Sequence, residues 1–123
     1  MAGVVVLGGG STGEHFCGAL RRADPDVPIT LVEPALVGGE CSYFACMPSK
    51  TLLRAPELIA EAARTPGVTA GPIDVEAIFA WRDWMTSGWD DAWQVAWLES
   101  ERIELVRGAG RVVRPGVVEA GGR

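Results

Sequence analysis

The sequence has little of several residue types that would mark a metal or disulfide scaffold. Its 123 residues contain one histidine and three cysteines. An odd number of cysteines in a chain without an export signal argues against a structural disulfide framework. One histidine also leaves few ligands for zinc, because only His15 and Cys17 could supplement the two remaining cysteines.

Positive charge and long apolar runs are also scarce. Eleven Lys and Arg face sixteen Asp and Glu, which gives a net charge of −5 and no basic stripe for nucleic acid. No apolar run reaches the length of a membrane span. The first ten residues contain four glycines and no Lys or Arg, unlike a signal peptide. We therefore expect a cytoplasmic protein with neither a membrane nor a nucleic acid as partner, and a length that suits one domain.

Short β-branched runs and one helical stretch organise the first third of the chain. The run from Val4 to Leu7 has the pattern of a strand buried on both faces, and a helix is expected from the following glycines to about Ala23. Ile29–Val32 is a second strand, closed by Glu33 and Pro34. Strand, helix and strand within about thirty residues predict one right-handed, Rossmann-like βαβ unit of an α/β fold.

Helical patterns fill the middle of the chain, and short strands fill its end. A helix is expected from about Cys41 to Arg64, with a kink or restart at Pro48. Asp74 is the expected cap of a third helix, which Gly88 divides, and its aromatic stripe is interpreted as core or domain interface: Trp81, Trp84, Trp89, Trp93 and Trp97. Three short apolar runs after residue 102 predict the start of a β-meander.

A glycine motif directly follows the first strand and opens the first helix. The residues Gly8-Gly9-Gly10-Ser11-Thr12-Gly13 fit G-x-G-x-x-G, the fingerprint of a dinucleotide site. Gly8 permits the tight turn, Gly10 allows a pyrophosphate to approach, and Gly13 allows close packing. Glu33 lies twenty residues past Gly13, where a carboxylate can accept hydrogen bonds from an adenosine ribose. The alternative is a glycine-rich turn without a ligand.

Two cysteines stand close together, at positions 41 and 46. On an ideal helix their Cα atoms would be about 8.7 Å apart, whereas a disulfide requires roughly 4.4–6.8 Å. A bridge between them therefore requires a distorted helix, or one that begins after Cys41. Such a bridge at a helix N-terminus would be readily reduced, as a cycling disulfide must be. Plain buried cysteines and half of a metal site are the competing interpretations.

Electron exchange between a dithiol and a nicotinamide runs most simply through a flavin, which favours FAD as the dinucleotide. Lys50 lies four residues after Cys46 and so falls on the same helix face. A cation there can stabilise a reduced flavin or a thiolate. An exposed surface lysine is the alternative.

Together these motifs resemble the N-terminal part of the class I pyridine nucleotide-disulfide oxidoreductases, which include dihydrolipoyl dehydrogenase, glutathione reductase and mercuric reductase. The resemblance rests on the glycine fingerprint, on Glu33 and on Gly39-x-Cys41-x4-Cys46-x-Pro48-Ser49-Lys50. It implies that Cys41 is the interchange thiol, that Cys46 lies against the flavin, and that Lys50 lies near the flavin ring. The pyrophosphate is then held by Gly8, Gly10, Ser11, Thr12 and Gly13, the ribose by Glu33, and Gly39 and Glu40 also line the FAD.

The resemblance also implies domains that these residues do not supply. We expect residues 1–123 to be the N-terminal part of an FAD/NAD(P)-binding domain, with NAD(P)-binding and dimerisation domains absent. Full-length protein would be an NAD(P)H-dependent enzyme and a homodimer, passing electrons via FAD and the Cys41–Cys46 disulfide to a small-molecule disulfide or quinone-like acceptor. The family has Thr at the position of Glu40, and Asn-Val-Gly where this chain has Tyr43-Phe44-Ala45.

Two other functions stay open at this point. One is a truncated, non-catalytic fragment or nucleotide-binding remnant. A weaker alternative is thiol-based handling of a metal such as mercuric ion, although no resident metal site is expected.

Overall fold

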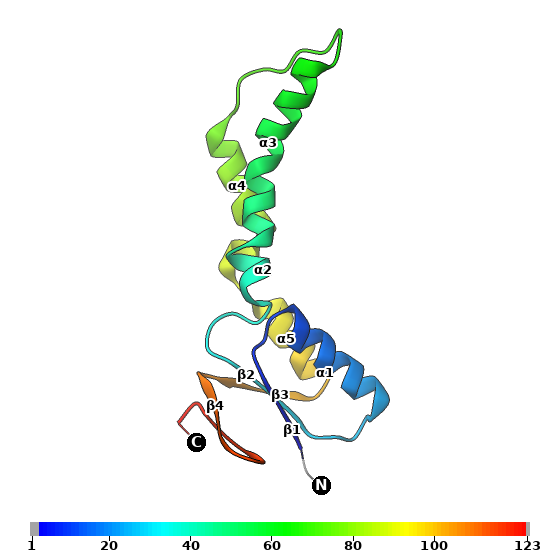
Figure 1. Cartoon of the computed structure of the whole chain (residues 1–123), viewed down its shortest axis with the longest axis vertical. Coiled ribbons are helices and arrows are strands. Elements are labelled where there is room, and N and C mark those ends of the chain that lie inside the picture. Colours follow the sequence, from blue (N-terminus) through cyan, green and yellow to red (C-terminus); the bar gives the residue numbers. More distant parts are fainter. Residues whose placement is uncertain (1–2, 123) are drawn as a thin grey trace.

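A small sheet and a long helical arm make up the chain in the computed structural model, which describes residues 3–122. Figure 1 shows the strands with α1 and α5 at one end and the arm of α3 and α4 projecting away from them. The first and last strands, β1 and β5, both lie at the sheet end, far from the tip of the arm. The two motifs of interest lie where the arm joins the sheet.

The sheet has three parallel strands in the order β1-β2-β3. β1 spans Val4–Leu7, β2 spans Ile29–Glu33 and β3 spans Ile103–Arg107. Val4 pairs with Ile29, and Ile29 pairs with Ile103, so the strands are in register at their first residues. The helix α1, Ser11–Ala23, connects β1 to β2 and completes the predicted βαβ unit. The α/β, Rossmann-like fold class expected from the sequence is confirmed.

Two helices cover one face of the sheet and enclose the core. They are α1 and α5, which spans Ala92–Ser100. The buried apolar residues of this core come from both helices, the strands and the loops between them: Cys17, Val27, Ile29, Leu31, Val37, Leu98 and Ile103. Cys17 is fully buried among them and therefore serves packing.

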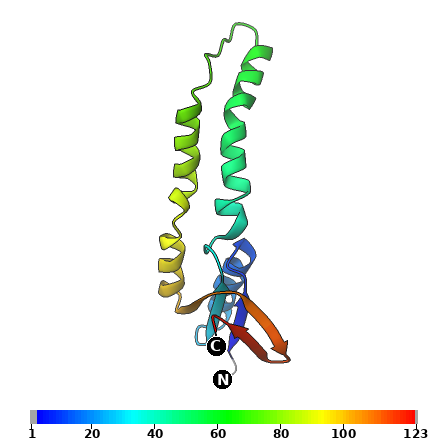
Figure 2. The same cartoon turned by 90° about the vertical axis from the view of Figure 1, so that its left-hand side faces the viewer.

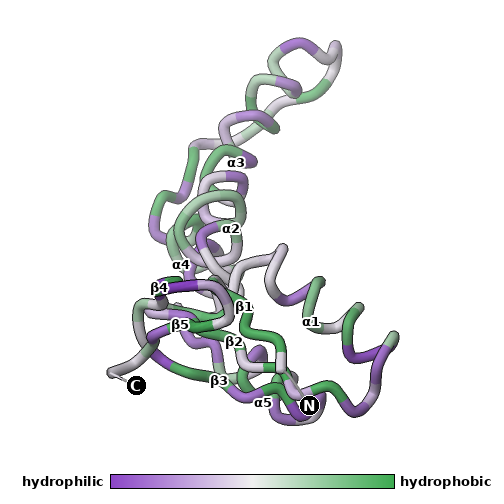
Figure 3. Tube along the Cα trace, turned by 60° about the horizontal axis from the view of Figure 1, so that its bottom comes forward, coloured by the Kyte–Doolittle hydropathy of each residue, from purple (hydrophilic) through white to green (hydrophobic). Residues whose placement is uncertain are grey.

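The opposite face of the sheet is covered only in part. The antiparallel hairpin of β4, Gly110–Arg114, and β5, Val117–Ala120, contributes Val118 and Ala120 to a small cluster with Val32 and Val106. β1 was expected to be buried on both faces, but its side chains alternate between half-buried and exposed. Val5 and Leu7 are 45% and 43% exposed, so the hairpin covers them only in part. Figure 3 shows the hydrophobic character of β1 along its length.

The strand β3 differs from the prediction in its partner. The sequence indicates that it begins a meander, but it instead joins β2 in parallel, and only β4 and β5 form an antiparallel pair. The helix α5 directly precedes β3 and lies on the same side of the sheet as α1, which is the geometry of a parallel crossover. Local apolar patterns cannot reveal such a partner.

The arm consists of two antiparallel helices that lie side by side in Figures 1 and 2. α2 spans Gly39–Tyr43 and α3 spans Cys46–Arg64, so the expected helix is broken before Cys46 and not at Pro48. α4 spans Val75–Met85, and the Asp74 carboxylate accepts from the backbone N–H of Ala77 at 3.0 Å, as predicted for a cap. None of the helices described is long and apolar enough to cross a membrane.

The predicted division at Gly88 is confirmed and forms a 3-10 turn, η1, over Ser87–Trp89. The aromatic stripe is not core: Trp84 is 74% and Trp93 is 82% exposed. Trp97 packs near Gly18 of α1. The stripe therefore lies mostly on the outside of this chain, and of the five tryptophans Trp97 packs against the core cluster.

A buried arginine joins the far end of α1 to the segment before β3. Arg21 is 8% exposed and donates to four backbone carbonyls. They belong to Pro25 and Val27 after α1, and to Glu101 and Arg102 after α5, at 2.7–3.0 Å. These carbonyls follow the ends of both helices, and the guanidinium gives all four a donor; the Pro25 carbonyl also accepts from Arg102 at 2.7 Å.

We therefore expect Arg21→Met to reduce the free energy of unfolding by about 2–4 kcal/mol, because the carbonyls lose a charged donor. Urea unfolding of the protein that carries this chain measures the effect. Arg22→Met is the control, since Arg22 is exposed, and should change stability by no more than about 0.5 kcal/mol. Equal losses in the two variants would contradict the role given to Arg21.

Candidate functional site

The glycine motif forms a turn that ends at the first turn of α1. Gly10 is the N-cap of α1 and no side chain caps this end. The first helical hydrogen bond runs from the Glu14 N–H to the Gly10 carbonyl at 3.0 Å. The N–H groups of Ser11, Thr12 and Gly13 therefore have no acceptor within the helix and lie at its positive end. This arrangement suits the pyrophosphate of a dinucleotide.

Gly13 is required for the turn to close on the helix. A Cβ at this position would lie 2.0 Å from the Gly8 carbonyl oxygen and 3.5 Å from a Val6 methyl. No side chain larger than hydrogen fits there without moving the backbone. The close packing predicted for the third glycine of the fingerprint is therefore present.

Glu33 ends β2 and lies beside the turn. It is 8% exposed, and its two carboxylate oxygens accept from the backbone N–H groups of Gly9 at 2.7 Å and of Ala35 at 2.8 Å. A carboxylate has further lone pairs, so these bonds leave it able to accept from a ribose hydroxyl. The carboxylate also fixes the turn to the loop that follows β2.

A second glycine pair packs directly against the turn. The Gly38 N–H donates to the Gly9 carbonyl at 2.7 Å, and Gly10 and Gly38 form an isolated parallel bridge. A Cβ on Gly39 would lie 2.6 Å from the Gly10 Cα, and its φ of 68° is in the left-handed region that favours glycine. This contact places the dinucleotide turn beside the start of the cysteine segment. Glu40 follows on the exposed side of α2.

The two cysteines lie on different helices. Cys41 is on α2, and Cys46 is the first residue of α3, after a break at Phe44 and Ala45. A disulfide between the two cysteines requires a distorted helix, and this break is such a distortion. Both thiols are free in this structure; Cys41 is exposed and Cys46 is half-buried. Cys46 is the neighbour with the largest effect on the pKa of Cys41.

The Cys46 thiol has the largest effect on the pKa of Cys41. The hydrogen bond to the Cys46 thiol is the main cause that raises the pKa of Cys41, followed by desolvation and by the charge on Cys46. The Lys50 ammonium, one turn along α3, acts in the opposite direction and lowers the Cys41 pKa. Lys50 itself is exposed. Its predicted place beside the pair is therefore consistent with the field that it exerts on Cys41.

Residues far along the chain hold the loop between β2 and α2, and sequence reasoning missed them. Asp91, at the start of α5, accepts from the Val37 N–H at 2.7 Å and from the Arg107 guanidinium at 2.6 Å. Arg107, at the end of β3, also donates to the Ala35 carbonyl. Each is an ordinary charged residue in the sequence, and only the parallel placement of β3 brings them together.

Tyr43, the last residue of α2, is a core residue at the junction between the arm and the sheet end. It is 2% exposed, its ring contacts the Cα side of Gly38, and its hydroxyl has no hydrogen-bond partner among the residues described. Burial is the main cause that raises the Tyr43 pKa, with the charges of Asp91 and Glu14 adding to it. The tyrosine ring therefore lies close to Gly38, where an added Cβ would be 2.8 Å from it.

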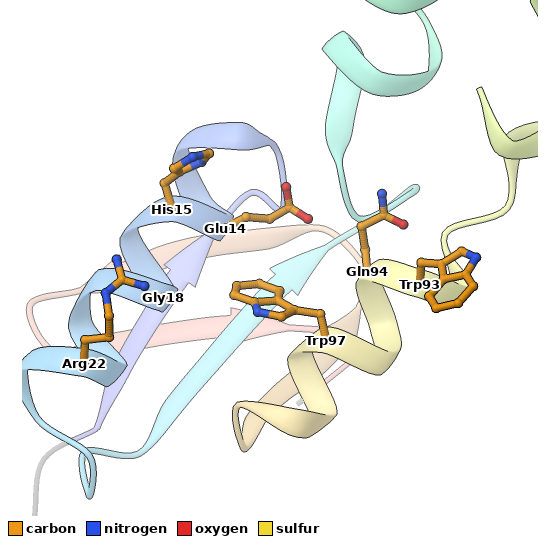
Figure 4. A pocket seen from close by; sticks show the side chains of 7 residues that line it. All are labelled: Glu14, His15, Gly18, Arg22, Trp93, Gln94 and Trp97. Carbon is orange, nitrogen blue, oxygen red and sulfur yellow. The ribbon is translucent and has the colours of Figure 1, made fainter. Parts of the chain in front are cut away.

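A separate groove of about 430 Å³ lies between α1 and α5. Figure 4 shows that its side chains come from these two helices: Glu14, His15, Gly18, Arg22, Trp93, Gln94 and Trp97. None of them belongs to the predicted site. His15 is exposed on α1, and its Nδ1 lies 2.7 Å from the Ser11 carbonyl. Among residues 3–122 there is no group of three or more His, Cys, Asp and Glu side chains arranged to hold a metal ion.

Comparison with known proteins agrees with this arrangement. Residues 2–123 match the family described as pyridine nucleotide-disulphide oxidoreductase. A mercuric reductase of Lysinibacillus sphaericus is 26% identical over 123 residues, covering 97% of this chain and 22% of that protein. A dihydrolipoyl dehydrogenase of Thermus scotoductus is 32% identical over 122 residues, covering 97% of this chain and 26% of that protein.

Solved structures share the fold. LpdA from Mycobacterium tuberculosis superposes with a TM-score of 0.75 at 24% identity, over 93% of this chain and 25% of that one. The HOCl-induced flavoprotein disulfide reductase RclA from Escherichia coli, in its Cu(II) complex, gives 0.72 at 18% identity, over 94% of this chain and 24% of that one. The chain thus spans about a quarter of the proteins it matches. Because the family match extends over almost every residue, the chain belongs to the pyridine nucleotide-disulphide oxidoreductase family.

Proposed function

We propose that this chain is the FAD-binding part of a flavoprotein disulfide oxidoreductase whose redox pair is Cys41 and Cys46. The observation that carries the proposal is the contact between the two glycine loops. In that contact the helix N-terminus suited to a pyrophosphate lies beside the segment that carries both cysteines. When bound, FAD supplies the two-electron chemistry that links a nicotinamide to a thiol pair.

In this proposal, different residues of the chain bind different parts of FAD. The free N–H groups of Ser11, Thr12 and Gly13 hold the pyrophosphate, and the turn from Gly8 to Gly10 leaves room for it. Glu33 accepts from the adenosine ribose. Gly39 and Glu40 line the cofactor at the start of α2. Lys50 provides a positive charge near the flavin ring and the thiols.

The exposure of the two sulfurs supports different roles for them. Cys41 is exposed and is the thiol that meets the acceptor, whereas half-buried Cys46 faces the flavin. In the cycle, the Cys41–Cys46 disulfide takes up two electrons and one proton, which originate as the hydride of NAD(P)H, together with one proton from solvent, and becomes two thiols. Cys41 then passes the electrons to a small-molecule disulfide or quinone-like acceptor. The NAD(P)H site, and the dimer in which we expect the enzyme to act, belong to the full-length protein.

The full-length protein is therefore expected to be yellow, and two-electron reduction should produce a long-wavelength thiolate–flavin absorption band. Cys46→Ser should lose this band, because the thiol at the flavin is gone. Cys41→Ser keeps Cys46 as a free thiol beside oxidised flavin and is the control, which should show the band before any reductant is added. A Cys46→Ser protein that holds flavin and keeps the band would exclude this role for Cys46.

Substitution of Gly13 tests the pyrophosphate site. In Gly13→Ala the added Cβ meets the Gly8 carbonyl at 2.0 Å, so the turn must shift and flavin binding should weaken by at least about tenfold, the effect of typical overpacking. The measurement is the flavin content of the purified protein, followed by FAD titration. Gly71→Ala is the control, since a Cβ there meets nothing within 4 Å. Full flavin content in Gly13→Ala would contradict the assignment.

The pH dependence of Cys41 alkylation tests the contact between the thiols. Cys46→Ala removes the main cause that raises the Cys41 pKa, so the midpoint of iodoacetamide alkylation should move to lower pH. Lys50→Gln removes a charge that lowers this pKa, so its midpoint should move to higher pH. Mass spectrometry of the Cys41 peptide gives the rate at each pH. Coincident profiles for the parent and both variants would show that the thiols do not interact.

A further inference from the structure

The break between α2 and α3 leaves backbone groups that an unbroken helix would have paired. The N–H groups of Phe44 and Ala45 both donate to the Glu40 carbonyl, at 2.9 and 2.6 Å, which closes α2. In an unbroken helix the Tyr43 carbonyl would accept the N–H four residues later. Here it accepts the indole N–H of Trp89 at 3.0 Å, from a residue 46 positions further along the chain. The carbonyl that marks the break is thus satisfied by a distant side chain.

Trp89 reaches this carbonyl from an unusual backbone. Ser87, Gly88 and Trp89 have φ values of 53°, 62° and 57°. The left-handed region costs a residue other than glycine roughly 1–2 kcal/mol, so Ser87 and Trp89 persist there only because surrounding contacts require it. The turn closes through the Trp89 N–H to the Thr86 carbonyl at 2.9 Å. Backbone strain is therefore concentrated where Trp89 contacts the cysteine segment.

A cation holds the indole in place. The Arg82 guanidinium lies 4.9 Å from the centroid of the Phe79 ring and 5.5 Å from that of the Trp89 ring. Arg82 is further fixed by Asp83, whose carboxylate lies 2.6 Å from it. Attraction between a guanidinium and two aromatic faces restricts the indole to the orientation that reaches Tyr43.

We propose that Trp89 is a positioning residue for the redox pair: it keeps the helix interrupted between Cys41 and Cys46 and thereby favours their disulfide. This inference rests on the redox function proposed above. Without the indole, the Tyr43 carbonyl is free to accept the N–H of Met47, and the segment between the cysteines moves toward helical geometry, although Pro48 keeps the two helices from joining fully. The cysteines would then move toward the helical Cα separation of about 8.7 Å, beyond disulfide range.

The thiol–disulfide equilibrium of the full-length protein tests the proposal. The protein is equilibrated with mixtures of reduced and oxidised dithiothreitol, and the Cys41–Cys46 disulfide is quantified by mass spectrometry after alkylation. In this exchange one dithiothreitol becomes its cyclic disulfide while the protein disulfide becomes two thiols, so the electrons and protons balance. Trp89→Phe keeps a ring but removes the donor, and should shift the equilibrium about tenfold toward the dithiol, or about 30 mV.

A matched control and a second variant complete the test. Trp93→Phe changes a tryptophan that is 82% exposed and should leave the equilibrium unchanged. Arg82→Gln releases the indole without removing its donor, and should shift the equilibrium in the same direction by about threefold, as expected for a cation–π contact. Arg82→Lys keeps a cation and should restore most of the parent value. If Trp89→Phe does not fold, Arg82→Gln and Arg82→Lys decide.

The outcomes separate the two proposals. If the parent protein forms the disulfide but neither Trp89→Phe nor Arg82→Gln moves its equilibrium, the positioning role of Trp89 is overturned and the redox function stands. If the parent protein forms no Cys41–Cys46 disulfide at any ratio of dithiothreitol, the redox function fails, and the role of Trp89 fails with it.

Discussion

The direct backbone contact between the two glycine loops is the constraint on which the rest of the site depends. Gly10 and Gly38 pair as in a parallel bridge, and Gly39 approaches so closely that a Cβ would lie 2.6 Å from the Gly10 Cα. A side chain at this point would separate the helix N-terminus that suits a pyrophosphate from the helix that carries Cys41. The close approach of the two motifs therefore depends on the absence of a Cβ at these glycines.

Charged groups from three parts of the chain stabilise that contact. Glu33 joins the Gly9 and Ala35 N–H groups from within the βαβ unit, and Asp91 with Arg107 holds the same loop from α5 and β3. Asp91 is 9% exposed, and the carboxylate of a buried acid is tolerated only when it is paired and hydrogen-bonded. Asp91 and Arg107 follow the arm in the chain, at the start of α5 and the end of β3. The segment after the arm therefore contributes to the site.

The sequence predicts the local parts of this arrangement well, since they follow from short-range rules. The βαβ unit, the cap at Asp74 and the break at Gly88 each depend on a few neighbouring residues. The required distortion between Cys41 and Cys46 follows from helix geometry alone. The exposure of Val5 and the partner of β3 were not predicted, because they depend on segments that pack from elsewhere. The bond from Trp89 to Tyr43 spans 46 residues, and a tryptophan in an aromatic stripe gives no sign of it.

The cysteines lie at the base of the arm, where its helices meet the sheet end of the chain. α3 begins at Cys46, so its first turn is fixed by the sheet-side contacts, while α4 returns the chain to the same point. The helices meet again at η1, where left-handed residues direct the indole of Trp89 at the break. A helical segment tends to propagate once formed, so an interruption needs a partner for each unpaired carbonyl. The arm supplies that partner at the Tyr43 carbonyl, which lies between the two cysteines.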